Sequence, residues 1–461
     1  MIANIYFILT LIFFVSFFFV KRETKLIILL IPFILCDNII PFLPVPIIST
    51  VRNTFILGFI LSEIKYIKKS FKYFPLKDTL YIIFISSLLI AINSEFLSGS
   101  QKIIRPIWGI LGLIYGIFLY SYTVSNQYSF SKIQKKVFLL LSILTLIGAI
   151  NYIYKDNIIL TQIYSNFNLQ SNISDDIGTL YQERDRFRVS SLFTNPFDYG
   201  YINLVIFLYF MYLYISKQYS NKLLVLLALI MSAWAVIFCG CRTVLLTLIL
   251  SIIIFLLYNY NLKKTSKYIF ISIILFIIFY FTIPFLREIT DAIISLFNSQ
   301  GGTSVQGSSI DMRLTQLYGS IEYFLQSPLF GNGFEYINEG LGWQDFDQSK
   351  MNTDMYGFES IIFVLLIERG LIGIIAYIYF AIKVYEYINK KKNIDRTCAA
   401  FGFSVFSAYL IFSILTGELL SLPITLFFLG ITIKHLDIKS KLLNTTIKNG
   451  NNRCISNHRK L

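Results

Sequence analysis

Arginines in three separate stretches of the chain have the types and spacing needed to hold a charged ligand. Arg184, Arg186 and Arg188 stand at alternate positions of one polar stretch, so their side chains share a face where that stretch is extended. Arg242 follows a Cys-Gly-Cys sequence, and Arg313 begins a segment with helical spacing. A guanidinium keeps its charge and forms two parallel hydrogen bonds with a phosphate. These arginines predict a site for a phosphate-like oxyanion, with ligands Arg186, Arg188, Arg242 and Arg313.

Carboxylates close to these arginines allow two interpretations. Glu183 and Asp185 are near enough in the sequence to pair with the neighbouring arginines, which would make that stretch an ordinary solvated loop. Asp354 and Glu359 stand instead just before an apolar segment, where a carboxylate can accept the proton of an attacking hydroxyl. We expect Glu359 to be the catalytic carboxylate, with Asp354 as the second candidate.

Histidine and cysteine chemistry is not expected in the main body of the chain. The two histidines, His435 and His458, both lie near the C-terminus, so neither a histidine general base nor a zinc site is predicted elsewhere. The five cysteines are odd in number and scattered, and predict no disulfide framework. We predict no required metal and no cofactor.

The elements that position these residues are predicted to be membrane-spanning helices. The 461 residues are 56% hydrophobic and 14% charged, whereas a soluble protein carries roughly a quarter charged residues. The apolar residues come in blocks of about twenty, which is the length that crosses a hydrocarbon core. The blocks lack the alternation of a membrane barrel, so their backbones must be helical. The predicted fold is an all-α integral membrane protein, a polytopic bundle of about 12–13 transmembrane helices with two large external loops.

The order of these blocks divides the chain into helical and polar parts. The predicted spans lie near 2–20, 27–43, 47–66, 79–95, 103–122, 137–154, 199–216, 223–240, 243–259, 268–286, 358–382, 399–416 and 419–433. The first lacks a basic start and a cleavage site, and is expected to be an uncleaved span. The predicted parts are N-terminal transmembrane helices (1–154), a first external loop (155–198), central helices (199–286), a second external loop with an amphipathic helix (287–357), C-terminal helices (358–433) and a cytoplasmic basic tail (434–461).

Lysines predict the orientation of this bundle in the membrane. Short lysine-rich stretches follow every odd-numbered span, as at 65–77, 132–136, 217–222, 263–267 and 383–396, and again in the tail. The positive-inside rule places these stretches in the cytoplasm, with the N-terminus outside and the C-terminus inside. The net charge of +14 therefore arises from loops between spans, and nucleic acid is not an expected partner. The arginines described above fall on the outer side.

The two outer loops contain local signals of structure. Asn195-Pro196 favours a turn that feeds the next helix. Residues 311–326 have helical spacing, with Leu314, Leu317, Tyr318, Ile321, Phe324 and Leu325 on one face and Arg313, Gln316, Ser320 and Glu322 facing away. This amphipathic helix is suited to lying on the membrane surface, and Ser327-Pro328 followed by Gly331-Asn332-Gly333 should end it and turn the chain. Glu368-Arg369 lies inside an apolar segment, where such residues either offset one another or serve function.

Three of these motifs resemble the O-antigen polymerase and O-antigen ligase superfamily of bacterial envelope glycosyltransferases. Arg188 with Asn195-Pro196 resembles the family's arginine and Asn-Pro entry to a span, and Cys241-Arg242 resembles its Ser-Arg motif. Arg313, the amphipathic helix, Ser327 to Gly333 and Glu368-Arg369-Gly370-Leu371-Ile372-Gly373 resemble its most recognisable block. The resemblance covers roughly residues 184–375. Two departures are cysteine in place of serine at position 241, and Glu359-Ser360 where ligases usually have a histidine.

The resemblance implies a polymerase that joins oligosaccharide repeat units on the outer face of the bacterial inner membrane. Its substrates would be linked to undecaprenyl pyrophosphate, and a chain-length regulator and a flippase would be its partners beside the lipid bilayer. The arginines would stabilise the leaving pyrophosphate, Glu359 or Asp354 would receive the proton of the attacking sugar hydroxyl, and the sugar carbon would invert. The absence of histidine from the outer regions favours the polymerase branch.

Three alternatives stay open at this point. An O-antigen ligase would transfer the glycan to lipid A-core by the same chemistry. A flippase for lipid-linked oligosaccharide would show two similar halves and short loops, and neither is obvious in this chain. A scaffold protein would tolerate alanine at Arg188, Arg242 and Arg313 together. The sequence does not identify the sugar, the linkage, or the choice between O-antigen, capsule and exopolysaccharide.

Overall fold

The computed structural model describes residues 71–107, 116–124, 130–157, 182–183, 186–193, 195–260, 310–341, 360–417 and 421–458, with scattered residues between 12 and 68 and between 266 and 287. The helices are α5 (Lys77–Asn93), α6 (Gln101–Ile104), α7 (Gly116–Val124), α8 (Phe130–Tyr154), α11 (Pro196–Ser216), α12 (Lys222–Phe238), α13 (Arg242–Asn259), α16 (Ile310–Gln326), α17 (Ile361–Val364), α18 (Gly370–Lys390), α19 (Arg396–Thr416) and α20 (Ser421–His458). Two π-helical turns, η5 (Tyr336–Gly340) and η7 (Leu365–Arg369), and two short antiparallel strands, β1 (Gln182–Glu183) and β2 (Arg186–Phe187), complete the described elements. The predicted spans near 2–20, 27–43, 47–66 and 268–286 lie wholly or mostly outside the described residues.

The described part of the chain is an all-α multi-pass membrane protein, as predicted. Six of its helical segments are long and apolar enough to cross a membrane: Ile133–Tyr154, Pro196–Ser216, Arg242–Asn259, Ile361–Lys390, Arg396–Thr416 and Ser421–Leu443. The helix Lys222–Phe238 is apolar but shorter. Each of these seven overlaps a predicted span in its place along the chain, with boundaries that differ by at most ten residues.

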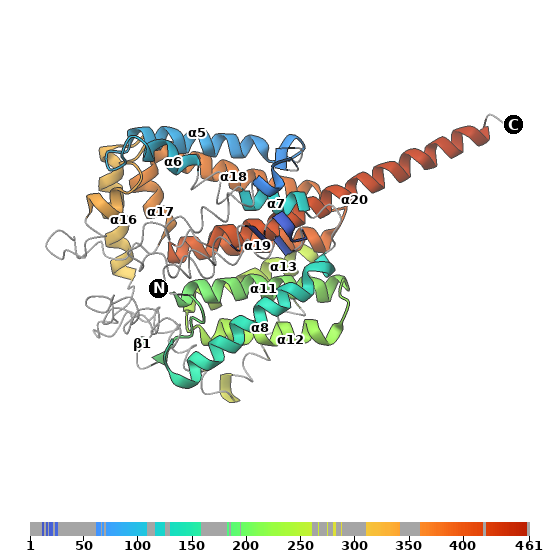
Figure 1. The fold of residues 1–461 in the computed structure, drawn as a ribbon, viewed down its shortest axis with the longest axis horizontal. Helices are drawn as coiled ribbons and strands as arrows, with labels where there is room; N and C mark the ends of the chain where they lie inside the picture. Colours follow the sequence, from blue (N-terminus) through green and yellow to red (C-terminus); the bar gives the residue numbers. More distant parts are fainter. Residues whose placement is uncertain are drawn as a thin grey trace.

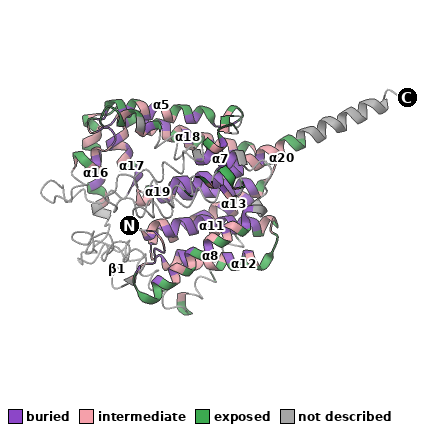
Figure 2. Ribbon diagram, viewed as in Figure 1, coloured by how far each residue is buried: buried purple, intermediate pink, exposed green. Residues whose placement is uncertain are grey.

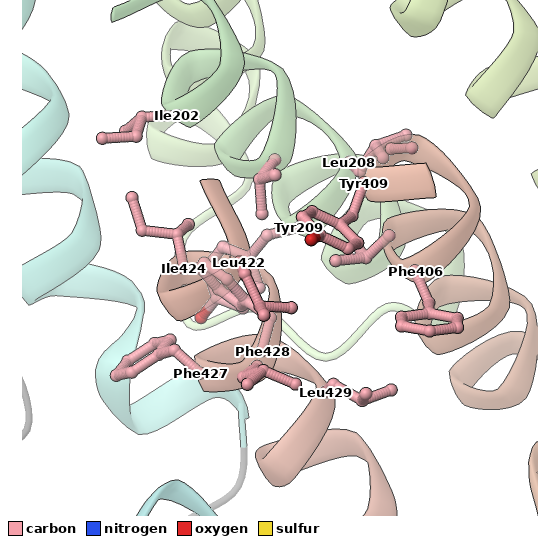
Figure 3. Packing of buried hydrophobic residues seen from close by; sticks show 14 of the residues in the cluster. Ile202, Leu208, Tyr209, Phe406, Tyr409, Leu422, Ile424, Phe427, Phe428 and Leu429 are labelled. Atoms are coloured by element: carbon pink, nitrogen blue, oxygen red, sulfur yellow. The ribbon is translucent and has the colours of Figure 1, made fainter. Parts of the chain in front are cut away.

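Three helices form the centre of the bundle. About three quarters of the residues in the apolar stretches of α11, α19 and α20 are buried, and Figure 2 shows the buried residues concentrated there. Aromatic rings fill the space between these helices. The ring centroids of Tyr209 and Phe428 are 5.2 Å apart (Figure 3). Tyr212 stacks on Phe401 with 5.1 Å between ring centroids. Such pairs add to the apolar burial that holds helices together.

The peripheral helices present apolar side chains on their outer faces. Leu146 of α8, Ile230 of α12 and Ile375 of α18 are exposed by 65%, 67% and 61%. Exposed large apolar side chains are numerous on these helices, and they match a lipid-facing surface. The outer surface of the bundle is therefore apolar, unlike that of a soluble protein, whereas its centre is packed like the core of a soluble protein.

The helices run antiparallel, and this arrangement separates two ends of the bundle. At one end, the last residue of α13, Asn259, accepts a hydrogen bond from Thr397 at the start of α19 (3.0 Å). The start of α13 therefore lies with the end of α19, at the opposite end. Lys391 and Lys439 lie at the first of these ends, where Lys391 donates to Ser440 (2.8 Å). We call these the lysine end and the arginine end; which of them faces the cytoplasm stays a prediction.

Helix α16 crosses the arginine end of the bundle, at an angle to the long helices (Figure 1). The predicted helix is confirmed, and its exposed apolar side chains agree with the predicted position at the membrane surface. Gln316 and Ser320 are fully buried against the protein, whereas Tyr318 and Leu325 are 66% and 68% exposed. The polar face packs on the bundle because Arg313 and its neighbours make contacts there, and the apolar face is left for the membrane surface.

Helix α20 continues from the core into the segment predicted as a tail. It begins at Ser421 beside α11, where Tyr201 and Thr425 share a hydrogen bond of 2.6 Å between their hydroxyls. It then runs without a break to His458 and extends beyond the body of the molecule (Figure 1). The basic residues between positions 434 and 458 are thus carried on a helix.

Candidate functional site

Arg188 is held at the arginine end by the segment that follows it. The backbone N–H of Val189 donates to the carbonyl of Phe238 at the end of α12 (3.1 Å). Asn157 donates to Ser190 Oγ (2.8 Å) and to the carbonyl of Ser191 (2.9 Å), and both serines are fully buried. These contacts fix the chain as it leaves β2 and re-enters the bundle. The stretch Arg186–Phe187 is extended, and the side chain of Arg186 lies outside the described residues.

The turn Cys239-Gly240-Cys241 packs directly against Arg188. Gly240 has a φ of +68°, and a Cβ atom there would lie 3.0 Å from Arg188 Cγ. Glycine is therefore required for two reasons: the backbone is left-handed, and the methylene groups of Arg188 pack directly on the turn. Arg188 also lies over the ring of Phe197, with its Cζ 5.9 Å from the ring centroid. The arginine is thus positioned by two separate helix ends.

The two cysteines of this turn are buried free thiols with different acidities. Burial raises the pKa of the Cys241 thiol. Burial alone would also raise the pKa of Cys239, but hydrogen bonds from Cys241 and the charge of Arg188 outweigh it and lower that pKa. The guanidinium therefore acts on its surroundings as a positive charge in a site of low polarity, where electrostatic interactions are strong.

Arg242 is the first residue of α13. The preceding residue, Cys241, is the N-cap and makes no side-chain hydrogen bond to the helix, whereas Asn195 caps α11 by accepting from the N–H of Phe197 (2.8 Å). A helix start with unsatisfied N–H groups carries partial positive charge and favours an anion. Arg242 and the start of α13 thus add positive charge beside Arg188.

Two buried hydroxyls at this end of the bundle lack partners. Among the described residues, neither Tyr199 Oη nor Thr243 Oγ1 has a hydrogen-bond partner. Tyr199 belongs to the start of α11, and Thr243 follows Arg242. Buried polar atoms are nearly always satisfied in native proteins, so such atoms commonly mark a place for a ligand or water. Sequence reasoning did not identify either residue, because nothing local distinguishes them from core tyrosines and threonines.

Arg313 lies in the first turn of α16 and joins it to the end of α19. Its Nη2 donates to the carbonyl of Leu415 (3.0 Å). Because the start of α13 and the end of α19 share the arginine end, Arg313 lies at the same end of the bundle as Arg188 and Arg242. The structure therefore brings three of the four predicted anion ligands to one end, and Arg186 adjoins them in the chain.

Other predicted site residues lie outside the described part of the chain. Glu359 and Asp354, the predicted catalytic carboxylates, precede Ser360 and lie outside the residues that the structure describes. The structure describes no group of three His, Cys, Asp or Glu side chains that could hold a metal among the residues it covers. Asp345-Phe346-Asp347, in the predicted second external loop, has a spacing suited to a divalent cation and also falls outside the described residues, so the prediction of no metal stays a prediction.

A second group of charged residues at the arginine end was only partly identified from the sequence. Glu368 lies in the π-helical turn η7 and accepts from the N–H of Ile337 (3.3 Å), which ties the loop after α16 to the span Ile361–Lys390. Arg105 forms an ion pair with Glu335, 230 residues further along the chain. The Glu368-Arg369 pair could be noticed inside its apolar segment, whereas no local signal links Arg105 to Glu335. π-Helical turns within helices are frequent at functional sites.

The backbone of the turn after α16 is in direct contact with the backbone at the start of α18. Gly331 and Gly370 both have positive φ, and a Cβ on Gly370 would lie 2.4 Å from Gly331 N. Asn332 completes the junction, with its N–H donating to the carbonyl of Ile367 (2.8 Å). The two halves of the predicted motif, Ser327 to Gly333 and Glu368 to Gly373, thus form one rigid unit behind α16.

The fold and this site define a polytopic α-helical membrane protein that gathers arginines from distant segments at one end of its bundle. The sequence profile of the O-antigen ligase family matches residues 226–378. This segment lies almost entirely within the stretch whose motifs resemble the O-antigen polymerase and ligase superfamily, and the match supports that resemblance. Members of this family are glycosyltransferase-like enzymes of polysaccharide assembly. No curated protein matches the chain.

Proposed function

We propose that this protein is a polymerase that joins oligosaccharide repeat units linked to undecaprenyl pyrophosphate, on the outer face of the bacterial inner membrane. The observation that carries the proposal is the gathering of Arg188, Arg242 and Arg313 at one end of the bundle. A pyrophosphate leaving group develops negative charge, and fixed guanidinium groups in a partly dry site stabilise that charge. The lysine residues at the opposite end fit the cytoplasmic face.

In the proposed reaction, a sugar hydroxyl of the acceptor attacks the sugar carbon that carries the pyrophosphate of the donor. The bond from carbon to pyrophosphate oxygen breaks, and the arginines receive the leaving group. Glu359, or Asp354 in its place, takes the proton of the attacking hydroxyl. Positioning of the two lipid-linked substrates supplies much of the rate, because pyrophosphate is a good leaving group. Inversion at the sugar carbon is what the resemblance to the superfamily suggests.

The placement of the histidines favours a polymerase over a ligase. His435 lies at the lysine end and contacts Asp395 through its Nε2 (3.3 Å), while His458 ends the projecting part of α20. Neither residue is close to Arg188, Arg242 and Arg313 along the bundle. Neither histidine is therefore placed to assist a reaction at the three arginines.

Gene disruption tests the proposal directly. Loss of a polymerase leaves lipopolysaccharide that carries one repeat unit, whereas loss of a ligase leaves lipopolysaccharide that carries none. A flippase would instead move lipid-linked oligosaccharide across a vesicle without lengthening it. Alanine at Arg188, Arg242 and Arg313 together should abolish polymer, and normal polymer from that variant would refute the proposed site in favour of a scaffold.

A further inference from the structure

A cluster of aromatic side chains lies at the arginine end, beside the C-terminal part of α16. The ring of Tyr336 makes edge-to-face contacts with Phe96 and with Tyr323, each at 5.8 Å between centroids. Gly340 permits this packing, because a Cβ there would lie 3.0 Å from Phe96 Cε2. All three rings are partly exposed. They form a cluster that is neither fully buried nor fully exposed.

Charged and amide groups surround this cluster. Glu335 pairs with Arg105 and also accepts from Asn338 Nδ2 (2.5 Å). Glu339 is exposed on the next turn of the chain. The Cζ atoms of Arg105 and Arg369 each lie 5.5 Å from the ring centroid of Phe334.

Arg369 stands out within this group. Among the described residues, its Nε has no hydrogen-bond partner. A guanidinium carries five N–H donors in a fixed fork. Arg369 stands two residues from Ile367, which packs with Tyr323 and Tyr336, so this planar donor is close to partly exposed aromatic rings and is suited to a polar ligand.

We propose that Phe96, Tyr323, Tyr336, Glu339 and Arg369, which we call the aromatic patch, bind sugar rings of the lipid-linked glycan. A sugar has an apolar face of C–H groups that packs on aromatic rings, and hydroxyls that accept from a guanidinium and donate to a carboxylate. Acyl chains would not tolerate the ionisable groups of the patch. A phosphate would be repelled by Glu339 and by the neighbouring Glu335. The inference rests on the proposed function, whose substrate supplies the glycan.

The position of the patch fits a glycan that is anchored at the arginine site. Arg313 lies in the first turn of α16, and Tyr323 lies ten residues further along the same helix. At about 1.5 Å per residue, the two are separated by ~15 Å along the helix axis. A glycan whose pyrophosphate is held near Arg313 would extend along α16 to the patch. The patch would then select the repeat unit, while the arginines hold the leaving group.

The test is direct binding of a glycan without its lipid to the full-length protein in nanodiscs. The probe is the repeat-unit oligosaccharide released by mild acid from the surface polysaccharide of the same bacterium, and the readout is saturation-transfer NMR with a titrated dissociation constant. Tyr336→Leu and Glu339→Gln should each weaken binding by about three- to tenfold. The matched controls Tyr318→Leu and Glu322→Gln, both on the exposed surface of α16, should bind as the wild type does.

Two results would overturn the inference: no binding of the probe by the folded wild type, or patch variants that bind as tightly as their controls. The proposed function fails separately. If cells lacking the protein still make full-length polymer while the patch variants lose glycan binding, the polymerase assignment is wrong and the patch stands. If those cells lose polymer while the patch variants bind normally, the patch is wrong and the assignment stands.

Discussion

Replacement of Gly240 by alanine is the sharpest perturbation of the arginine site that leaves every charged group in place. The backbone of Gly240 has a φ of +68°, and an added Cβ would lie 3.0 Å from Arg188 Cγ. A left-handed backbone costs an alanine about 1–2 kcal/mol relative to glycine. The contact with the arginine stem is relieved by a shift of a few tenths of an ångström, which moves the guanidinium away from its position over Phe197.

Gly240→Ala should cause a small loss of stability and a larger loss of polymer synthesis. The free energy of unfolding should fall by about 1–2 kcal/mol, read as a modest decrease of Tm in detergent. Polymer synthesis should fall by a larger factor, on the order of tenfold or more, because small displacements at a reacting centre are costly. The assay is polymer length and amount on a gel from cells with equal protein levels.

Two further variants separate the causes. Gly240→Asn places a residue that tolerates the left-handed backbone at the same position but keeps the Cβ, so stability should recover while synthesis stays low. Gly99→Ala adds a Cβ that meets nothing within 4 Å, and should change neither quantity. Normal synthesis by both Gly240 variants would refute the argument that the passage of Arg188 over this turn matters.

Three other predictions follow from the same contacts. Arg313→Lys keeps the charge but loses the planar fork and its bond to the α19 end, and should reduce polymer synthesis about ten- to a hundredfold with little change in Tm. Gly370→Ala places a Cβ 2.4 Å from a backbone nitrogen and should lower stability by about 2–5 kcal/mol, so that a Tm equal to that of the wild type would contradict the junction described here. Burial opposes ionisation of Asp395, but hydrogen bonds from His435 and Lys439 outweigh it and hold the pKa of that carboxyl below its usual value of 3.8. Ionised Asp395 therefore stabilises the fold at pH values above that usual value, and this contribution is lost as the pH falls below it. In thermal melts at decreasing pH below 5, the Tm of the wild type should fall more steeply than the Tm of Asp395→Asn.

Local signals in the sequence predicted the parts of the structure that depend on a few neighbouring residues. Asn195 before Pro196 predicted a helix start, because asparagine caps a helix and proline suits its first position. Ser327-Pro328 and the glycines at 331 and 333 predicted a helix end and a turn. The apolar blocks predicted the spans. In each case the physical cause lies within a stretch of about ten residues.

Features that depend on distant parts of the chain could not be predicted. The pairing of Arg105 with Glu335 joins residues 230 positions apart, and neither one has a sequence context that identifies the other. The packing of α16 on the bundle also depends on distant residues. Its pattern is amphipathic, but the pattern does not say which face meets protein, and the bundle offers acceptors such as the carbonyl of Leu415 to its polar side. The predicted carboxylates Glu359 and Asp354 remain predictions.

The unbroken course of α20 has a practical consequence for how the protein meets the aqueous phase. The helix contains 38 residues, which corresponds to about 57 Å of rod. A bilayer with its headgroups is about 40–45 Å thick, so roughly one quarter of the rod must stand clear of the lipid. Any reporter protein fused to this terminus would be held at a distance from the bilayer by a stiff spacer, and antibodies or soluble proteins could reach that rod without touching the membrane.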